Sequence, residues 1–190
     1  RFLTVEFSND HFVHLSRGRQ ILLGEVPVRD FFDPGLFLQY YASAAALTLS
    51  GGTLLGEAIL TASAVALGAA LTFVLAATLS ASTTLGLAAA VATAATGPRL
   101  YSYPKVFLFV LALVCAHFYA RKRSKAGLVI LAAVTAMAFL FRHDHGVYIG
   151  LTLAGFFLPP PRGAPPRALS DSLRGGGLPA RFLWPLALFL

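Results

Sequence analysis

Long apolar segments separated by short polar ones dominate the chain. No charged residue stands between Glu57 and Arg99, and a helix needs about 20 residues to cross the hydrocarbon core of a bilayer. The polar run SASTT at 80–84 falls near the middle of this stretch, where serine and threonine side chains can satisfy the backbone groups of a tight turn. The pattern therefore predicts two helices, at about 53–79 and 84–98.

Three further apolar segments follow, at 106–120, 126–141 and 146–161. Each is slightly shorter than a full crossing, and the Tyr, Lys and Arg residues beside them can lengthen the span by snorkelling. A soluble protein can bury one such helix, but five of them with so little charge between them would leave no polar surface. We therefore expect an all-α fold, a polytopic transmembrane helix bundle of about five spans.

Composition agrees with this interpretation. Of the 190 residues 57% are hydrophobic and only 12% are charged, whereas an ordinary soluble domain has about 25% charged residues. The net charge of +7 would suggest nucleic acid as a partner of a soluble protein. Here it indicates orientation in a membrane, and we expect no nucleic-acid partner.

A basic cluster sets the expected orientation. The segment 121–125 holds four basic residues and no acid, and the positive-inside rule places such a segment in the cytoplasm. Counting spans from it assigns the other polar segments to the two sides: 1–52, 99–105 and 142–146 outside, and 80–83 and 162–181 inside. The inner set then holds eight basic residues and one acid, and the outer set seven and six. We expect a multi-pass protein of the inner (plasma) membrane.

These assignments divide the chain into four parts. Residues 1–52 form an extracytoplasmic loop with two juxtamembrane helices, 53–158 the transmembrane bundle, 159–181 a cytoplasmic loop rich in Pro, Gly and Arg, and 182–190 the start of a further span. Because the chain begins with Arg1 and ends in an apolar run too short to cross a bilayer, we expect it to be a fragment of a longer protein.

The N-terminal loop concentrates acidic residues, five of the eight in the first 33 positions. Ser8 or Asn9 can cap a helix over 10–23, with Asp10 in the first turn, where the helix dipole favours a carboxylate. A break at 24–27 follows. Asp33 as a cap and Pro34 at the first helical position then predict a second helix over 34–50.

This loop carries a family resemblance. The residues NDHF at 9–12 and RGRQILLGEVPVRDFFDPG at 17–35, followed by an aromatic-rich helix and a long apolar span, resemble the first extracytoplasmic loop of the GT-C class of integral membrane glycosyltransferases. They are similar to the bacterial relatives of dolichyl-phosphate-mannose protein mannosyltransferases and of lipid A aminoarabinose transferase. The resemblance covers about residues 7–158 and is specific at 9–35.

The resemblance implies a catalytic role for Asp10. In that class an acidic residue opens this loop, two juxtamembrane helices follow, and a sugar linked to polyprenyl phosphate is used on the outer face. Asp10 would act as the general base toward the acceptor, or would position it. Many members carry a second acid directly afterwards, where this chain has His11. The alternative for Asp10 is an acid that only stabilises its helix.

Two further outer segments carry candidate binding residues. The loop RLYSYPK at 99–105 combines two cations with two aromatics, which suits a lipid-linked phosphate and equally suits interfacial anchoring. The residues RHDH at 142–145 fall on the same side, for phosphate contact, metal binding or loop solvation. The candidate substrate-binding residues are Arg99, Tyr101, Tyr103, Lys105, Arg142, His143 and His145.

Other polar residues leave alternatives open. His11 and His14 could share a cation with Asp10, so a divalent metal is possible, but a solvated pair at the interface is the favoured interpretation. Glu57 stands near the outer end of its helix, where it could pair with Arg142 or Arg99 or simply lie at the interface.

The sequence thus favours a glycosyltransferase that moves a sugar from a polyprenyl-phosphate donor to an acceptor on the extracytoplasmic face, in contact with membrane lipid. The alternative is a transporter or flippase subunit for a lipid-linked or acidic solute. Transporters place ionisable residues at mid-membrane depth, and 58–98 has no charged residue. A third hypothesis is a structural subunit without chemistry.

Overall fold

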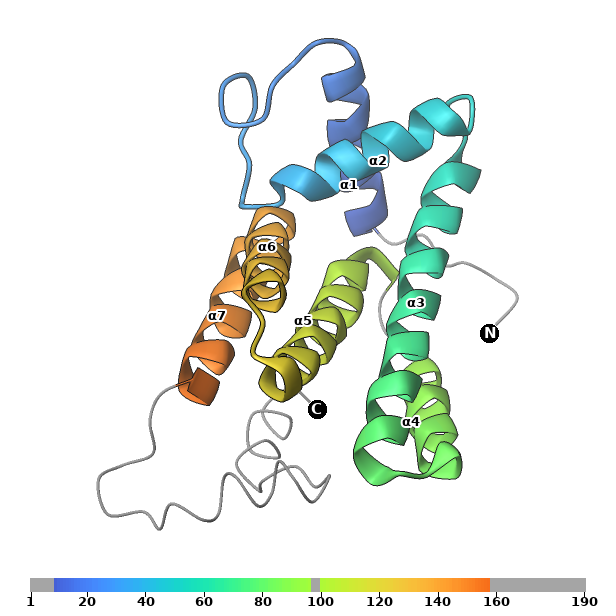
Figure 1. The fold of residues 1–190 in the computed structure, drawn as a ribbon. Coiled ribbons are helices and arrows are strands. Elements are labelled where there is room, and N and C mark those ends of the chain that lie inside the picture. The colour runs from blue at the N-terminus through green and yellow to red at the C-terminus, as the bar shows by residue number, and fades with distance from the viewer. Residues whose placement is uncertain (1–8, 97–99, 158–190) are drawn as a thin grey trace.

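The computed structural model describes residues 9–96 and 100–157, and this part of the chain is helical (Figure 1). It has no β-strand there, only an isolated bridge between Pro27 and Phe31. The predicted all-α fold is therefore confirmed. The helices are α1 (Asn9–Leu22), α2 (Phe37–Leu49), α3 (Leu54–Ser80), α4 (Thr83–Ala95), α5 (Tyr103–Lys122), α6 (Lys125–Phe141) and α7 (His143–Phe157), with a 3₁₀ turn, η1 (Leu100–Ser102), before α5.

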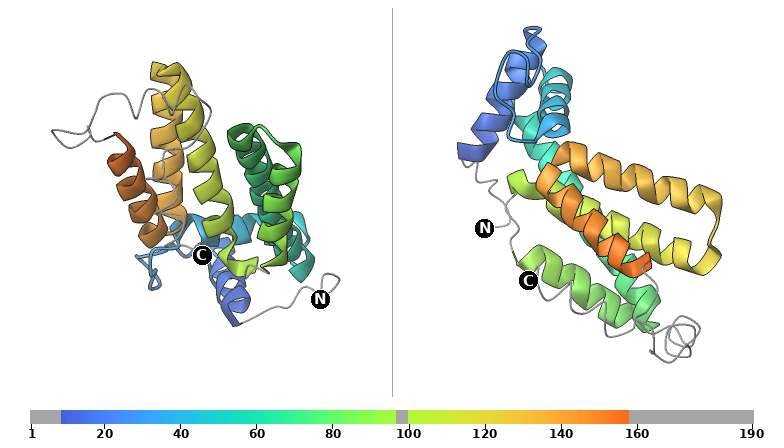
Figure 2. Two further views of the ribbon diagram at one scale, coloured as in Figure 1. Left: turned by 90° about the horizontal axis from the view of Figure 1, so that it is seen from below. Right: turned by 90° about the vertical axis from the view of Figure 1, so that its left-hand side faces the viewer.

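The helices run up and down as a bundle, and α1 and α2 cover one end of it (Figures 1 and 2). At this end, called here the α1/α2 end, α3, α5 and α7 begin and α6 finishes. The α3–α4 and α5–α6 turns lie at the opposite end (Figure 1). The described parts of the segments expected on one side of a membrane are 9–52, 100–105 and 142–146. They lie at one end of the bundle, and the basic cluster at 121–125 lies at the other.

Within 9–96 and 100–157, two helical segments are long and apolar enough to cross a membrane, Leu54–Ser80 with 27 residues and Leu100–Lys122 with 23. At 1.5 Å per residue, α3 is about 40 Å long, more than the roughly 30 Å of hydrocarbon. The apolar helices α4 and α6 are shorter, with 13 and 17 residues. The bounds of α4 and α6 lie within a few residues of those predicted. Of the described helices, α3 and the segment formed by η1 and α5 reach spanning length without flanking residues.

The second juxtamembrane helix begins later than predicted, at Phe37 instead of Pro34. Oδ1 of Asp33 accepts hydrogen bonds from the backbone nitrogens of Gly35 (2.8 Å) and Leu36 (2.7 Å), so it closes a turn ahead of the helix. Gly35 delays the helix because its φ of 96° is left-handed. Its carbonyl accepts a hydrogen bond from the backbone nitrogen of His143 at 3.1 Å. This turn therefore ties the loop to the start of α7.

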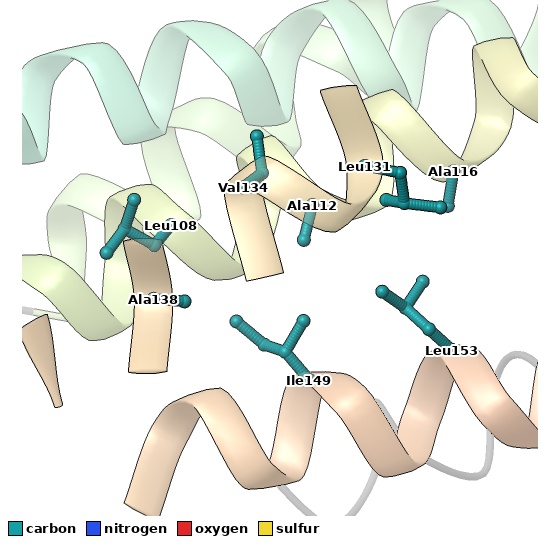
Figure 3. Packing of buried hydrophobic residues seen from close by; sticks show 8 residues of the cluster. All are labelled: Leu108, Ala112, Ala116, Leu131, Val134, Ala138, Ile149 and Leu153. Atoms are coloured by element: carbon teal, nitrogen blue, oxygen red, sulfur yellow. The ribbon is translucent and has the colours of Figure 1, made fainter. Parts of the chain in front are cut away.

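An apolar core joins α5, α6 and α7 (Figure 3). Each helix contributes residues one or two turns apart, and alanines among them let the helices approach closely. The core residues are Leu108, Ala112, Ala116, Leu131, Val134, Ala138, Ile149 and Leu153. This packing holds the α6–α7 corner, and with it residues 142–145, beside the start of α5.

Helices α1 and α2 cross at a glycine. A Cβ on Gly18 would lie 2.9 Å from the backbone nitrogen of Ala44 and 3.2 Å from the carbonyl carbon of Ser43. Both are backbone atoms and cannot move aside without shifting α2. The close crossing brings the buried face of α1 onto α2.

We predict that Gly18→Ala lowers the free energy of unfolding by about 1–3 kcal/mol, because the added methyl group forces the two helices apart. Gly155→Ala is the matched control, since a Cβ there meets nothing within 4 Å and alanine favours the helix by about 0.5–1 kcal/mol. Denaturation in detergent micelles, followed by circular dichroism, measures both. Equal stabilities of the two variants would contradict the close crossing.

Candidate functional site

The two histidines of α1 face the protein interior. His11 is 1% exposed and His14 is 4% exposed, so the expectation of a solvated interfacial pair is wrong. Both rings pack against Tyr101 of η1, with centroid distances of 5.8 and 6.4 Å. The histidines therefore lie on the face by which α1 is attached to the bundle.

Gln39 of α2 links α1 to the start of α5. This fully buried side chain uses Nε2 to donate hydrogen bonds to the carbonyl oxygen of Tyr101 at 2.8 Å and to Nδ1 of His14 at 3.0 Å. A carbonyl oxygen only accepts, so the NH₂ end of the amide must face Tyr101. Nδ1 of His14 then accepts, and the ring is neutral with its proton on Nε2.

The electrostatic surroundings favour the same neutral form. Burial lowers the pKa of His14 to about 4; His11 adds to the lowering, Asp10 opposes it and Arg142 adds a smaller lowering effect. Burial also lowers the pKa of His11, against the opposing charge of Asp10. The charges of Asp10 on α1 and Arg142 at the end of α6 thus both reach His14, which places these two residues at the same end of the bundle.

Glu57 is buried beneath α1, which corrects the expectation that it lies at the interface or pairs with Arg142. Its side chain is 0% exposed, and Oε1 lies 3.8 Å from Nδ1 of His11. The Ser43 hydroxyl lies beside the carboxylate. Neither carboxylate oxygen has a well-formed hydrogen bond within the described residues. Arg99, the other expected partner, lies outside those residues.

Six buried polar side chains therefore meet where α1 joins α2, α3 and α5. Each is less than a tenth exposed, and the contacts above connect them, with Tyr103 close enough to Glu57 to feel its charge. We call them the buried polar cluster: His11, His14, Gln39, Ser43, Glu57 and Tyr103. Of these, Tyr103 was a candidate for substrate binding, and its burial keeps it from the surface.

The charged candidates lie at the surface of the same end. Asp10 and Lys105 are exposed. Arg142 is partly buried and pairs with Asp144, where Nε and Nη2 each lie 3.3 Å from a carboxylate oxygen. The charge of Lys105 also reaches Asp144. Asp10, Lys105 and Arg142 therefore all lie at the α1/α2 end, which also carries the exposed ion pair of Arg29 and Asp30.

The remaining candidates divide between the surface and the interior. His143 is exposed beside Gly35, whereas His145 is buried with Nε2 3.2 Å from the carbonyl oxygen of Lys105. Because α7 begins at His143, these two residues are about 200° apart around the helix and face different sides. Tyr101 is partly buried against the two histidines of α1.

The residues do not assemble a strong metal site. Within 9–96 and 100–157 no group of three His, Cys, Asp or Glu side chains is placed to hold one ion. His11, His14 and Glu57 are of ligand types, but the fold does not bring three such side chains to one point.

An apolar groove of about 660 Å³ lies between α6 and α7. It is lined by Leu128, Leu131, Ala132, Thr135, Ala136, Phe139, Leu140, Gly146, Gly150 and Leu153. A second, much smaller hollow between α5 and α7 is also apolar. Neither hollow is lined by Asp10, Lys105 or Arg142.

Comparison of the chain with protein-family models, with curated proteins and with solved structures finds no match.

We predict that His14 makes folding sensitive to acid. Its pKa falls from 6.5 in the unfolded chain to about 4 in the fold, so between these values the unfolded state binds more protons. The free energy of unfolding should then drop by about 3 kcal/mol as the pH falls from 6.5 to 4. His14→Gln, which cannot titrate, should remove this part of the drop. Denaturation at several pH values tests it, and parallel curves for the two proteins would contradict it.

Proposed function

We propose that this chain belongs to a polytopic membrane glycosyltransferase of the GT-C class, which transfers a sugar from a polyprenyl-phosphate donor to an acceptor on the extracytoplasmic face. One observation carries the proposal: the exposed carboxylate of Asp10 and the guanidinium of Arg142 lie at the same end of the bundle, and both act on His14. The resemblance of residues 9–35 to that class supports the same activity.

The chemistry of glycosyl transfer needs both charges. The acceptor oxygen attacks the anomeric carbon, the bond from that carbon to the phosphate oxygen breaks, and the phosphate leaves with the electron pair. The acceptor proton passes to a base, here Asp10, while positive charge develops on the sugar. Arg142 and Lys105 would hold the phosphate as its negative charge grows. The ion pair with Asp144 keeps the guanidinium at the surface.

The proposal also places the bundle in a membrane. We propose that α3 and α5 cross the bilayer directly and that α4, α6 and α7 cross with the help of flanking aromatic and basic residues. The basic cluster at 121–125 then faces the cytoplasm of a cell whose inner membrane holds the protein. The α1/α2 end faces outward, where α1 and α2 lie near the lipid headgroups and a polyprenyl phosphate presents its sugar.

A transporter is the second candidate, because a buried carboxylate in a membrane helix is typical of ion-coupled transport. Glu57 has this character. It stands in the first turn of α3, however, and no charged residue follows it in α3 or α4. The carboxylate is therefore at one end of the bundle and not at its centre, which favours the transferase.

Asp10→Asn in the intact protein should lower the transfer rate by about 10²–10⁴-fold without loss of membrane insertion, because the amide cannot accept the proton. The assay follows the release of polyprenyl phosphate from polyprenyl-phosphate mannose or aminoarabinose in membrane vesicles. Glu25→Gln, another acid of the same loop, is the matched control and should keep the wild-type rate. Full activity of Asp10→Asn would exclude the catalytic assignment.

Arg142→Gln should weaken donor binding by about tenfold, because it removes a charge-assisted contact to the phosphate. Binding of polyprenyl phosphate to the protein in micelles measures this change. Lys122→Gln removes a cation from the opposite end of the bundle and should leave the affinity unchanged. A similar loss in both variants would indicate a general charge effect and would argue against a phosphate site at Arg142.

A further inference from the structure

The buried polar cluster contains one carboxylate, that of Glu57. Its side chain is fully buried, and the Ser43 hydroxyl lies beside it, but neither carboxylate oxygen has a well-formed hydrogen bond within the described part of the chain. Burying a carboxyl group in this way is unfavourable, and such groups in membrane helices commonly mark a functional site. A leucine would fill similar space without that disadvantage.

The residue that Glu57 faces is the neighbour of Asp10. Nδ1 of His11 lies 3.8 Å from Oε1 of Glu57, and the edge of its ring packs on Tyr101 at an interplanar angle of 88°. The imidazole is thus held between α3 and η1. Asp10 itself is exposed, so the direction of its side chain depends on how the first turn of α1 is fixed.

We infer that Glu57 is a positioning residue of the proposed active site: it holds His11 from inside the bundle and so fixes the turn of α1 that carries Asp10. The inference rests on the proposed function for its effect on catalysis. Its effect on α1 can be measured without any activity. Glu57 touches neither donor nor acceptor, because α1 separates it from the surface.

Other groups also face His11 and must be kept intact in the test. Asp10 and His14 lie on its own helix, Tyr101 and Tyr103 belong to η1 and α5, and Arg142 acts on the neighbouring His14. A variant at Glu57 leaves all of these unchanged. Glu57→Gln keeps the size of the side chain and removes its charge.

Glu57→Gln should lower kcat by about 10²-fold, the loss expected from a misplaced catalytic group, with little change in the KM for the donor. Thr61→Ala is the matched control: Thr61 lies one turn further along the same buried face of α3, and its hydroxyl donates to the carbonyl oxygens of Glu57 and Ala58 in its own helix. It should keep the wild-type kcat. A wild-type kcat in Glu57→Gln would overturn the inference.

The double variant tests whether Glu57 acts through His11. His11→Ala should cause a loss of similar size, and adding Glu57→Gln to it should cause no further loss, because residues that act as a unit are not additive. Independent, multiplying losses would overturn the inference. Should Glu57→Gln fail to insert, Glu57→Asp, which retracts the charge from His11, takes its place in both comparisons.

Amide hydrogen exchange of α1 separates this inference from the proposed function. Glu57→Gln and His11→Ala should each speed exchange in the first turns of α1 at least about tenfold, whereas Thr61→Ala should not. If exchange changes in this way but even the wild type transfers no sugar, the attachment of α1 stands and the transferase proposal fails. Unchanged exchange in α1 would overturn the positioning role, whatever the activity.

Discussion

The arrangement of the whole α1/α2 end depends on one buried amide. Nε2 of Gln39 donates both to the carbonyl of Tyr101 and to Nδ1 of His14, so a single side chain of α2 connects α1 with the turn that starts α5. Without it, a carbonyl and an imidazole would be buried without these partners, at a penalty of about 1–3 kcal/mol each. The amide also requires a neutral His14, which is the form that burial of the ring favours.

Around this amide, the polar side chains lie at two depths. The buried polar cluster fills the junction of α1, α2, α3 and α5, whereas Asp10, Lys105 and Arg142 stay at the surface of the same end. The apolar core of α5, α6 and α7 supports this division, because it fixes the corner that carries Arg142. Gly35 adds a second support by tying the loop before α2 to His143.

Most of the helices could be predicted from the sequence, because apolar runs bounded by charges leave little choice of where a helix begins and ends. The start of α2 could not, since the positive φ of Gly35 overrides the Asp33–Pro34 signal. The burial of His11, His14 and Glu57 was missed for another reason. Helical periodicity shows which residues share a face, but only the tertiary fold decides that the histidine face of α1 meets the bundle and not the solvent.

The two carboxylates on either side of His11 differ in what they can do. Asp10 is exposed and can meet an acceptor hydroxyl, whereas Glu57 is enclosed by four helices and can meet only other side chains. Environment, and not residue type, therefore separates the acid proposed to react from the acid proposed to support it. An acid in place of His11 would put a second carboxylate against Glu57. The imidazole of His11 faces the carboxylate of Glu57 instead, so the first turn of α1 packs there without repulsion between like charges.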